Sequence, residues 1–271
     1  MVLNHIDHLS PLDVDILGSI FLGLRNISDT KMIKSPTMKA IVTGGTGFIG
    51  ANLARRLLQD GHVVHIILRP ESARWRLEGL TGKIVTHEVS LNDTEALKRE
   101  LGAIKPDWVF HLAAFGGSSW QIDKKTIVET NLLGTMNLLD ACMEIGFEAF
   151  INTGTSSEYG FKNHAPPETE FLEPNSCYAI AKAGATHYCR NIGVSQKSHI
   201  LTLRLYSAFG PFEQPKRLMP ALILNGLKGR FPPLVDPEVA RDFIYIDDVV
   251  DAFIAAAKAK KIEPGGVFNI G

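Results

Sequence analysis

The amino-acid sequence predicts an α/β fold, a doubly wound parallel sheet followed by a smaller C-terminal region. Short, continuously apolar segments alternate with amphipathic segments from Lys39 onward, which is typical of parallel strands buried between helices. A glycine-rich turn joins the first of these strands to the first helix. The chain has 271 residues, of which 45% are hydrophobic and 21% charged, so it is long enough to bury a large core.

The predicted elements follow one another in chain order. KAIVTG at 39–44 predicts a strand, and GANLARRLLQDG at 50–61 predicts a helix with Leu53, Leu57 and Leu58 on one face. Further apolar runs predict strands at 62–69, 83–90, 107–114, 148–155 and 200–210, and TEALKRELGA predicts a helix at 94–103. In such sheets ligands bind beyond the carboxyl ends of the strands.

The turn between the first strand and helix reads TGGTGFIG at 43–50, with the spacing Gly44-x-x-Gly47-x-x-Gly50. Glycine loses more backbone entropy on folding than any other residue, so its use here indicates a close approach to the backbone. The first N–H groups of a helix favour an anion such as phosphate. The turn therefore predicts a dinucleotide site. The alternative is a tight turn with close helix–strand packing and no ligand.

The chain divides into three parts by pattern. Residues 38–210 form the predicted dinucleotide-binding domain, and 211–271, rich in Pro and Gly, form a smaller substrate-binding region interwoven with the sheet. Residues 1–37 are interpreted as an extension outside the core; a loosely docked N-terminal helix is the alternative. Because VFNIG ends the chain on a strand-like run, we expect the C-terminal region to be truncated.

The end of the second predicted strand bears on the kind of dinucleotide. An acidic residue there binds a free ribose 2′-hydroxyl, whereas Arg accommodates a 2′-phosphate. This chain has Arg69, with Arg74 and Ser72 close by. Arg binds phosphate through paired hydrogen bonds, so the sequence favours NADP(H), with NAD(H) as the alternative. Solvated surface arginines would give the same pattern, and Ser90 leaves adenine recognition open.

A tyrosine and a lysine are spaced for proton transfer. Tyr178 precedes Lys182 by four residues, which places both on one face of a helix. A nearby ammonium and a positively charged nicotinamide would lower the tyrosine pKa from about 10 toward working pH. Thr155 ends a predicted strand and could orient a substrate oxygen toward Tyr178. The alternatives are an exposed helical pair and a turn-forming hydroxyl.

Composition argues against several function classes. The formal net charge of −1 gives no electrostatic case for nucleic acid or an anionic membrane. The longest apolar run, Ile16 to Leu24, is too short to span a bilayer. The chain's three cysteines match no metal spacing and read as reduced thiols of a cytoplasmic protein, so no metal site is predicted.

Together these motifs resemble the extended short-chain dehydrogenase/reductase family, in its nucleotide-sugar epimerase, dehydratase and reductase branch, which has a Rossmann fold. The resemblance covers residue 39 to the end. It rests on TGGTGFIG at 43–50, HLAA at 111–114, ETNLLGTMNLLDA at 129–141, TSSEYG at 155–160, YAIAK at 178–182, RLYSAFGP at 204–211 and RDFIYIDDVVDAF at 241–253.

The resemblance implies roles for the matching residues. Thr155, Tyr178 and Lys182 would be catalytic, and Arg241 would approach the diphosphate of a nucleotide sugar. Asn131 would line the cofactor or instead support Lys182. The other implied contacts are Gly44, Gly47, Phe48, Ile49, Ala113, Ala114, Tyr178 and Lys182 for the cofactor and Ser156 and Ser207 for the substrate.

Departures from the family pattern narrow the reaction. Dehydratases carry an acid and a base one and two residues after the hydroxyl position, where this chain has Ser156 and Ser157. Glu158 is one residue further and, in an extended segment, would point to the other face. We therefore favour a 4-ketoreductase or 4-epimerase over a 4,6-dehydratase. A non-enzymatic dinucleotide sensor or scaffold is the alternative from another class.

The family also commonly dimerises through two helices of each subunit. The matching segments here are Val128–Ile145 and Tyr178–Ile192. Their apolar content is compatible with a homodimer built on a four-helix bundle, although the same faces could pack on the sheet.

Overall fold

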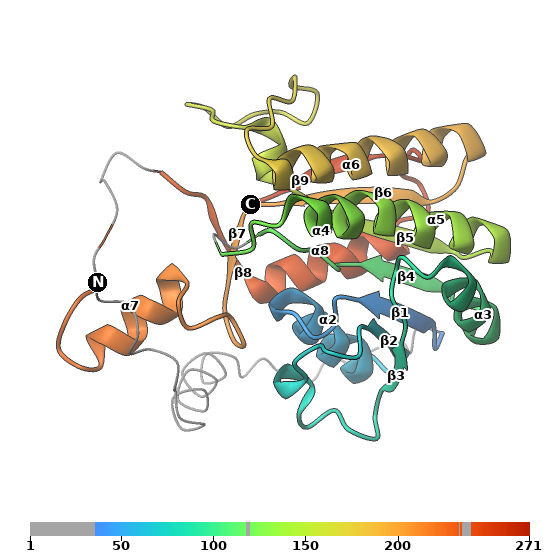
Figure 1. The fold of residues 1–271 in the computed structure, drawn as a ribbon, viewed down its shortest axis with the longest axis horizontal. Helices are drawn as coiled ribbons and strands as arrows, with labels where there is room; N and C mark the ends of the chain where they lie inside the picture. Colours follow the sequence, from blue (N-terminus) through green and yellow to red (C-terminus); the bar gives the residue numbers. More distant parts are fainter. Residues whose placement is uncertain (1–35, 118–119, 233, 235–239) are drawn as a thin grey trace.

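The computed structural model describes residues 36–117, 120–232, 234 and 240–271. A parallel sheet of seven strands has the order β3-β2-β1-β4-β5-β6-β9, which confirms the predicted doubly wound fold (Figure 1). The chain enters at β1 in the middle of the sheet and winds outward in both directions. The strands are β1 (Lys39–Thr43), β2 (Val63–Leu68), β3 (Val85–Glu88), β4 (Trp108–His111), β5 (Ala149–Thr155), β6 (Ile200–Leu205) and β9 (Val267–Ile270).

Helices cover both faces of this sheet. On one face α2 (Phe48–Gln59) and α8 (Ile246–Lys258) bury Leu53, Leu57 and Phe253. On the other face α3 (Thr94–Ile104), α5 (Gly134–Ile145) and α6 (Cys177–Gln196) bury a second cluster, which includes Leu138 and Cys189. The sheet is therefore closed from water on both sides, which leaves its carboxyl edge as the place for a ligand.

Segment 200–210, predicted as one strand, is two strands in the structure. Strand β6 ends at Leu205, and β7 (Ser207–Phe209) pairs in parallel with β8 (Phe243–Tyr245) in a separate sheet. The partner changes at one residue, because Tyr206 donates to Ile270 in β9 and Ser207 donates to Asp242 beside β8. Beyond β7, helix α7 (Leu218–Gly226) lies at one side of the main sheet, at the left of Figure 1.

Some predictions concern parts of the chain that the structure does not describe. Residues 1–35 of the predicted extension, and with them the apolar run Ile16 to Leu24, lie outside the described residues. Within the described ranges, no helix is long and apolar enough to cross a bilayer. Strand β9, which belongs to the predicted region 211–271, is hydrogen-bonded to β6 of the main sheet.

Candidate active site

The glycine-rich turn is shaped by close backbone packing. Gly44 has φ +68°, and a Cβ there would lie 2.6 Å from the backbone of Leu112 and Ala113 after β4. A Cβ on Gly50 would lie 2.4 Å from the Gly44 carbonyl oxygen. Close packing is therefore enough to explain Gly44 and Gly50. This is the packing part of the alternative given above, a tight turn without a ligand. The same packing brings the start of α2 to the edge of the sheet.

The N-terminus of helix α2 has no side-chain cap that would compete with an anion for its first N–H groups. Its N-cap is Gly47, which has no side chain to bond the first N–H groups, and its first turn contains no acidic residue. Such a helix start, with the positive end of its dipole, is suited to phosphate. The turn thus combines tight packing with an open helix N-terminus.

Two cavities meet at this turn. One has a volume of about 460 Å³ and the other about 340 Å³, and both are lined by Gly44, Gly47, Leu112 and Ala114. A ligand with two halves joined by phosphates fits this shape, with its joint over the glycine turn. The residues present therefore suit a dinucleotide.

The smaller cavity holds part of the predicted ribose-binding group. Arg69 and Ser72 line it, as do Ala113 and Ser90. Arg69 also forms an exposed ion pair with Glu71 at 3.2 Å. Arg74 is not among the lining residues and pairs with Glu88 at the end of β3. The structure thus brings Arg69 and Ser72 together but turns Arg74 away.

The larger cavity collects the predicted catalytic and substrate residues. Thr155 at the end of β5 and Tyr178 at the start of α6 line it together. The predicted residues Phe48, Ile49, Ser156, Ser207 and Arg241 line the same cavity. Lys182 is 1% exposed and is not among the lining residues of either cavity.

The electrostatic surroundings of Tyr178 differ from the expectation. Burial raises its pKa to about 12, and the hydrogen bond from Thr155 and the charge of Arg217 only partly oppose this. The expected cation was Lys182. Burial lowers the pKa of Lys182 itself, and the charge of Glu158 counteracts this. In the structure the phenol is therefore protonated at neutral pH.

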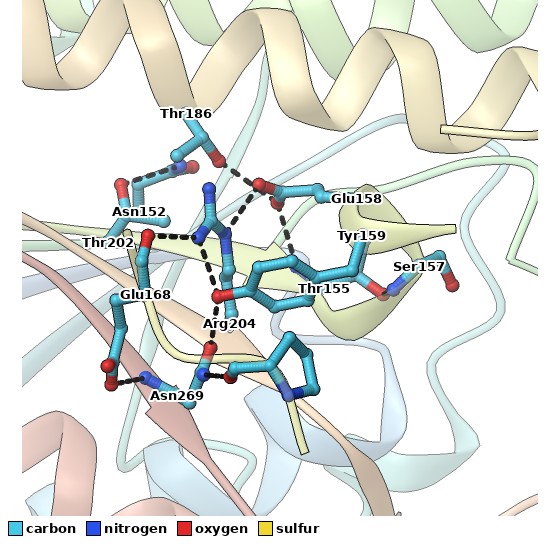
Figure 2. A network of polar contacts seen from close by, with 11 residues as sticks. Asn152, Thr155, Ser157, Glu158, Tyr159, Glu168, Thr186, Thr202, Arg204 and Asn269 are labelled. Atoms are coloured by element: carbon cyan, nitrogen blue, oxygen red, sulfur yellow. Dashed lines mark hydrogen bonds and ion pairs between the residues drawn. The ribbon is translucent and has the colours of Figure 1, made fainter. Parts of the chain in front are cut away.

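Glu158 organises the loop that carries Thr155. Residues Ser156–Tyr159 form a 3₁₀ turn rather than an extended segment, so Glu158 points into the interior and is fully buried. Its carboxylate accepts from the Thr155 N–H at 2.9 Å, the Thr186 hydroxyl at 3.0 Å and Arg204 Nε at 2.8 Å (Figure 2). Figure 2 shows the network continuing through Arg204 and Tyr159 to Asn269 of β9.

The 3₁₀ turn also fixes the orientation of the Thr155 hydroxyl. Its oxygen accepts from the Ser157 N–H at 3.2 Å, so its own hydrogen is free to be donated toward Tyr178 or a substrate oxygen. Sequence reasoning missed Glu158 as a positioning residue. The T-x-x-E spacing of a capping box was the available signal.

A buried chain of hydrogen bonds fixes the protonation of His111. Thr135 donates to the Asn131 carbonyl, so its oxygen accepts from His111 Nε2–H at 2.9 Å. Nδ1 then accepts from the Thr43 hydroxyl at 2.7 Å. Burial lowers the His111 pKa to about 3, which keeps the ring neutral. This chain joins β1 and β4 to the π-helical turn η2 (Glu129–Leu133).

Asn131 acts on the backbone of a cavity residue. Its side chain accepts from the Phe115 N–H at 3.0 Å and donates to the Phe115 carbonyl at 2.6 Å. Phe115 lines the smaller cavity, and Asn131 itself is completely buried. The structure therefore gives Asn131 a supporting position behind the cavity wall and not the predicted place in its lining.

Three residues that sequence reasoning did not single out also line the larger cavity. Arg76 is 7% exposed, and burial lowers its pKa to about 10. Arg217 lies 3.6 Å from Glu213, whose pKa burial raises from 4.5 to about 7. Their spacing follows no periodic pattern, so only the fold reveals them. Among the described residues, no cluster of three or more His, Cys, Asp or Glu side chains could hold a metal.

Comparisons with known proteins agree with this geometry. Residues 40–271 match the family model described as the NAD dependent epimerase/dehydratase family. The chain is 31% identical over 245 residues to "Uncharacterized UDP-glucose epimerase YtcB" of Bacillus subtilis, covering 86% of this chain and 77% of that protein. It is 30% identical over 259 residues to dTDP-D-glucose 4,6-dehydratase of Dictyostelium discoideum, covering 86% and 58%.

Solved structures give the same picture. The UDP-glucose 4-epimerase of Thermotoga maritima, with UDP-glucose, superposes with a TM-score of 0.77 and 29% identity, covering 86% of this chain and 77% of that one. The UDP-glucuronic acid 4-epimerase of Bacillus cereus, in complex with UDP-glucuronic acid and NAD, has a TM-score of 0.75 and 32% identity, again covering 86% and 77%.

We expect Glu158→Gln to lower the free energy of unfolding by about 3 kcal/mol, because it leaves the Arg204 guanidinium buried without a counter-charge. Urea denaturation would measure the change. Glu144→Gln is the matched control: it removes an exposed ion pair with Lys98 and should leave the urea midpoint nearly unchanged. Equal effects of the two substitutions would contradict the importance of the buried pair.

We expect Glu213→Gln to become stabilising relative to the unchanged protein as pH rises from about 4.5 to about 7. The folded state raises the Glu213 pKa to about 7, so it holds a proton that the unfolded chain releases near 4.5. Stability is therefore lost across this window and stays lost above it, whereas glutamine remains neutral. Urea denaturation at pH 5 and pH 8 would show the difference; an equal gap at both would contradict it.

Proposed function

Because the chain belongs to the NAD dependent epimerase/dehydratase family, we propose that it transfers a hydride and a proton at C4 of a nucleotide-linked sugar, as a 4-ketoreductase or 4-epimerase. The observation that carries this proposal is the shared cavity. Thr155 and Tyr178 line the same cavity of about 460 Å³ as the glycine turn and Arg241. A hydride carrier, a proton donor and a cation for a diphosphate would therefore meet in one space.

The residues of the chain supply the proton chemistry. A bound nicotinamide would supply or accept the hydride. Tyr178, protonated in the structure, would donate its proton to a C4 ketone oxygen and recover it from a C4 hydroxyl in the reverse direction. Thr155 would donate a hydrogen bond to the same oxygen and hold it toward Tyr178. Lys182, buried one helical turn further, and a positively charged cofactor would both lower the tyrosine pKa.

The residues after Thr155 support this reaction over dehydration. Ser156 and Ser157 line the cavity at the positions where dehydratases of the family carry their acid and base. A serine hydroxyl has too high a pKa to replace a carboxyl in elimination. Relatives named as 4-epimerases and as 4,6-dehydratases both match this chain, so the test must include both reactions.

We propose NADP(H) as the cofactor. Arg69 and Ser72 at the smaller cavity support this, because both could donate to a 2′-phosphate. The ion pair of Arg69 with Glu71 would have to open for that contact. NAD(H) is the alternative, and it is the dinucleotide named with the Bacillus cereus relative.

We also propose a homodimer through α5 and α6. In the segment Val128–Ile145 and in α6, four apolar side chains of the described residues are exposed: Val128 by 37%, Leu133 by 42%, Ile180 by 59% and Val194 by 58%. A four-helix bundle between two copies would cover them.

We expect the purified protein to bind NADPH more tightly than NADH. Arg69→Ala should weaken NADPH binding about tenfold, the value of one charge-assisted hydrogen bond, and leave NADH unchanged. One sample of the purified protein would be denatured, and any released dinucleotide identified by mass. A fluorescence titration of the folded protein would then measure the affinities for NADPH and NADH. Arg74→Ala is the matched control, because Arg74 pairs with Glu88 outside the cavity. Tightly retained NAD⁺ or NADH would contradict the NADP(H) proposal and favour an epimerase.

We expect Tyr178→Phe to lower kcat by about 10²- to 10⁴-fold, because it removes the proton-transferring hydroxyl. The assay would follow C4 inversion of UDP-glucose and dTDP-glucose, reduction of their 4-keto derivatives, and loss of water. Tyr188→Phe on the same helix, which removes only a contact to Asp140, should leave kcat unchanged. An unchanged protein without hydride transfer on any substrate would favour the non-enzymatic alternative, and dominant loss of water would favour a dehydratase.

A further inference from the structure

Glu213 is a buried carboxyl in the wall of the larger cavity. It lies in PFEQP at 211–215, between β7 and α7, and is 8% exposed. Thr155, Tyr178 and Arg217 line the same cavity. No step of the proposed hydride and proton transfer uses this carboxyl.

The loop that carries Glu213 has an unfavourable backbone conformation that contacts with neighbouring segments hold in place. Phe212, the preceding residue, has φ +69°, a left-handed conformation that is unfavourable for a side chain of this size. Its carbonyl accepts from Arg76 Nε at 2.7 Å, and its ring lies 3.9 Å below the Arg55 guanidinium. Asn52 of α2 donates to the Pro211 carbonyl at 3.0 Å. These contacts tie the loop to the start of α2 and fix the carboxyl at the cavity.

The carboxyl lacks a full set of hydrogen-bond donors. Its Oε1 lies 3.6 Å from Arg217 Nε, which is long for a hydrogen bond, and Arg217 and the Gly210 backbone only partly oppose the effect of burial on the Glu213 pKa. Its Oε2 is buried and has no hydrogen-bond partner among the described residues. A buried acceptor without a donor destabilises the folded protein, and a ligand that supplies the donor removes that penalty.

We propose that Glu213 accepts a hydrogen bond from a ring hydroxyl of a bound carbohydrate, the hexose of the nucleotide sugar, and thereby selects substrates that carry this hydroxyl. The inference rests on the proposed function. The buried Oε2 needs a donor, and a phosphate oxygen has no hydrogen to give, whereas a sugar hydroxyl has one; a protonated carboxyl still keeps an acceptor oxygen for it. Arg76, Arg217 and Arg241 line the same cavity and provide cations for the phosphates.

The position of Arg217 favours the hexose over the ribose of the cofactor. Arg217 Nε lies 3.6 Å from Glu213 Oε1, and both residues line the cavity that Tyr178 also lines. Neither Glu213 nor Arg217 lines the smaller cavity, where the predicted ribose-binding residues Arg69 and Ser72 lie. The sugar carbon that reacts must lie beside the Tyr178 phenol, so the hexose occupies the same cavity as Glu213.

The test compares ligands that differ by one hydroxyl. Calorimetry would give the affinities of UDP, UDP-glucose, dTDP-glucose and the monodeoxy analogues of the tighter sugar nucleotide, for the unchanged protein, Glu213→Ala and Glu213→Gln. We expect Glu213→Ala to weaken sugar-nucleotide binding by about 10- to 100-fold and UDP binding by less than about twofold. Glu213→Gln, which keeps an acceptor oxygen, should recover a large part of the affinity. One deoxy analogue should lose affinity for the unchanged protein and none for Glu213→Ala.

Other results would overturn the inference. Equal losses for UDP and the sugar nucleotides would show a general effect on the cavity. A loss confined to NADPH or NADH titrations would assign the carboxyl to the cofactor ribose. A fall in kcat with unchanged affinity would make Glu213 an acid or base. If no sugar nucleotide binds the unchanged protein while the dinucleotide does, the proposed function fails and this inference with it.

Discussion

Glu158 and Arg204 place a pair of opposite charges in the interior, at 0% and 3% exposure, and the arrangement of the site depends on their contact. Neither charge could stay buried alone, because transfer of an ion from water is costly unless a partner and hydrogen bonds satisfy it. Each group therefore holds several elements at once. Glu158 holds the turn with Thr155 and helix α6 through Thr186, and Arg204 holds β6 and the ring hydroxyl of Tyr159. The turn that carries Thr155 and the helix that carries Tyr178 are thereby tied to one buried ion pair.

A second constraint is the distribution of charge around the cavity. Close to the cavity, His111 is held neutral by its hydrogen bonds, and burial raises the pKa of Tyr178. Arg76, Arg217 and Arg241 line the larger cavity, where their charges can meet the phosphates of a ligand. The charges buried in the interior include Glu158 and Arg204, which offset each other.

The sequence predicted the fold because the information for it is local. Apolar runs gave the strands, and TGGTGFIG located the turn at which both cavities meet. Thr155 and Tyr178, 23 positions apart by number, were matched from motifs and do line one cavity. Arg74 pairs with Glu88 of the neighbouring strand and does not line the smaller cavity, so its contact with a cofactor stays a prediction. Nothing in local spacing carries that information.

The other differences have the same origin. Glu158 was expected to point to the other face of an extended segment; the segment is a 3₁₀ turn, and Glu158 lies away from the cavity lining, buried in the interior. Lys182 was expected to lower the Tyr178 pKa together with a nicotinamide, which stays a prediction; Arg217, which the sequence places far beyond Lys182, also lowers that pKa. Glu213 and Arg76 reach the cavity from segments without periodicity. Such residues are found only when the topology brings distant segments together.

The hydrogen bond between Tyr159 and Asn269 joins residues 110 positions apart. Asn269 lies in β9, the strand that follows the others of this sheet in the described chain, and its side chain also bonds the Pro166 carbonyl. The loop that carries Thr155 therefore lacks one of its supports until β9 has been synthesised and has docked on β6. Contacts of this sequence separation form late, because a long loop must close first. The nascent chain can thus assemble the glycine turn, built from β1, α2 and β4, before the Thr155 side of the larger cavity gains its full support.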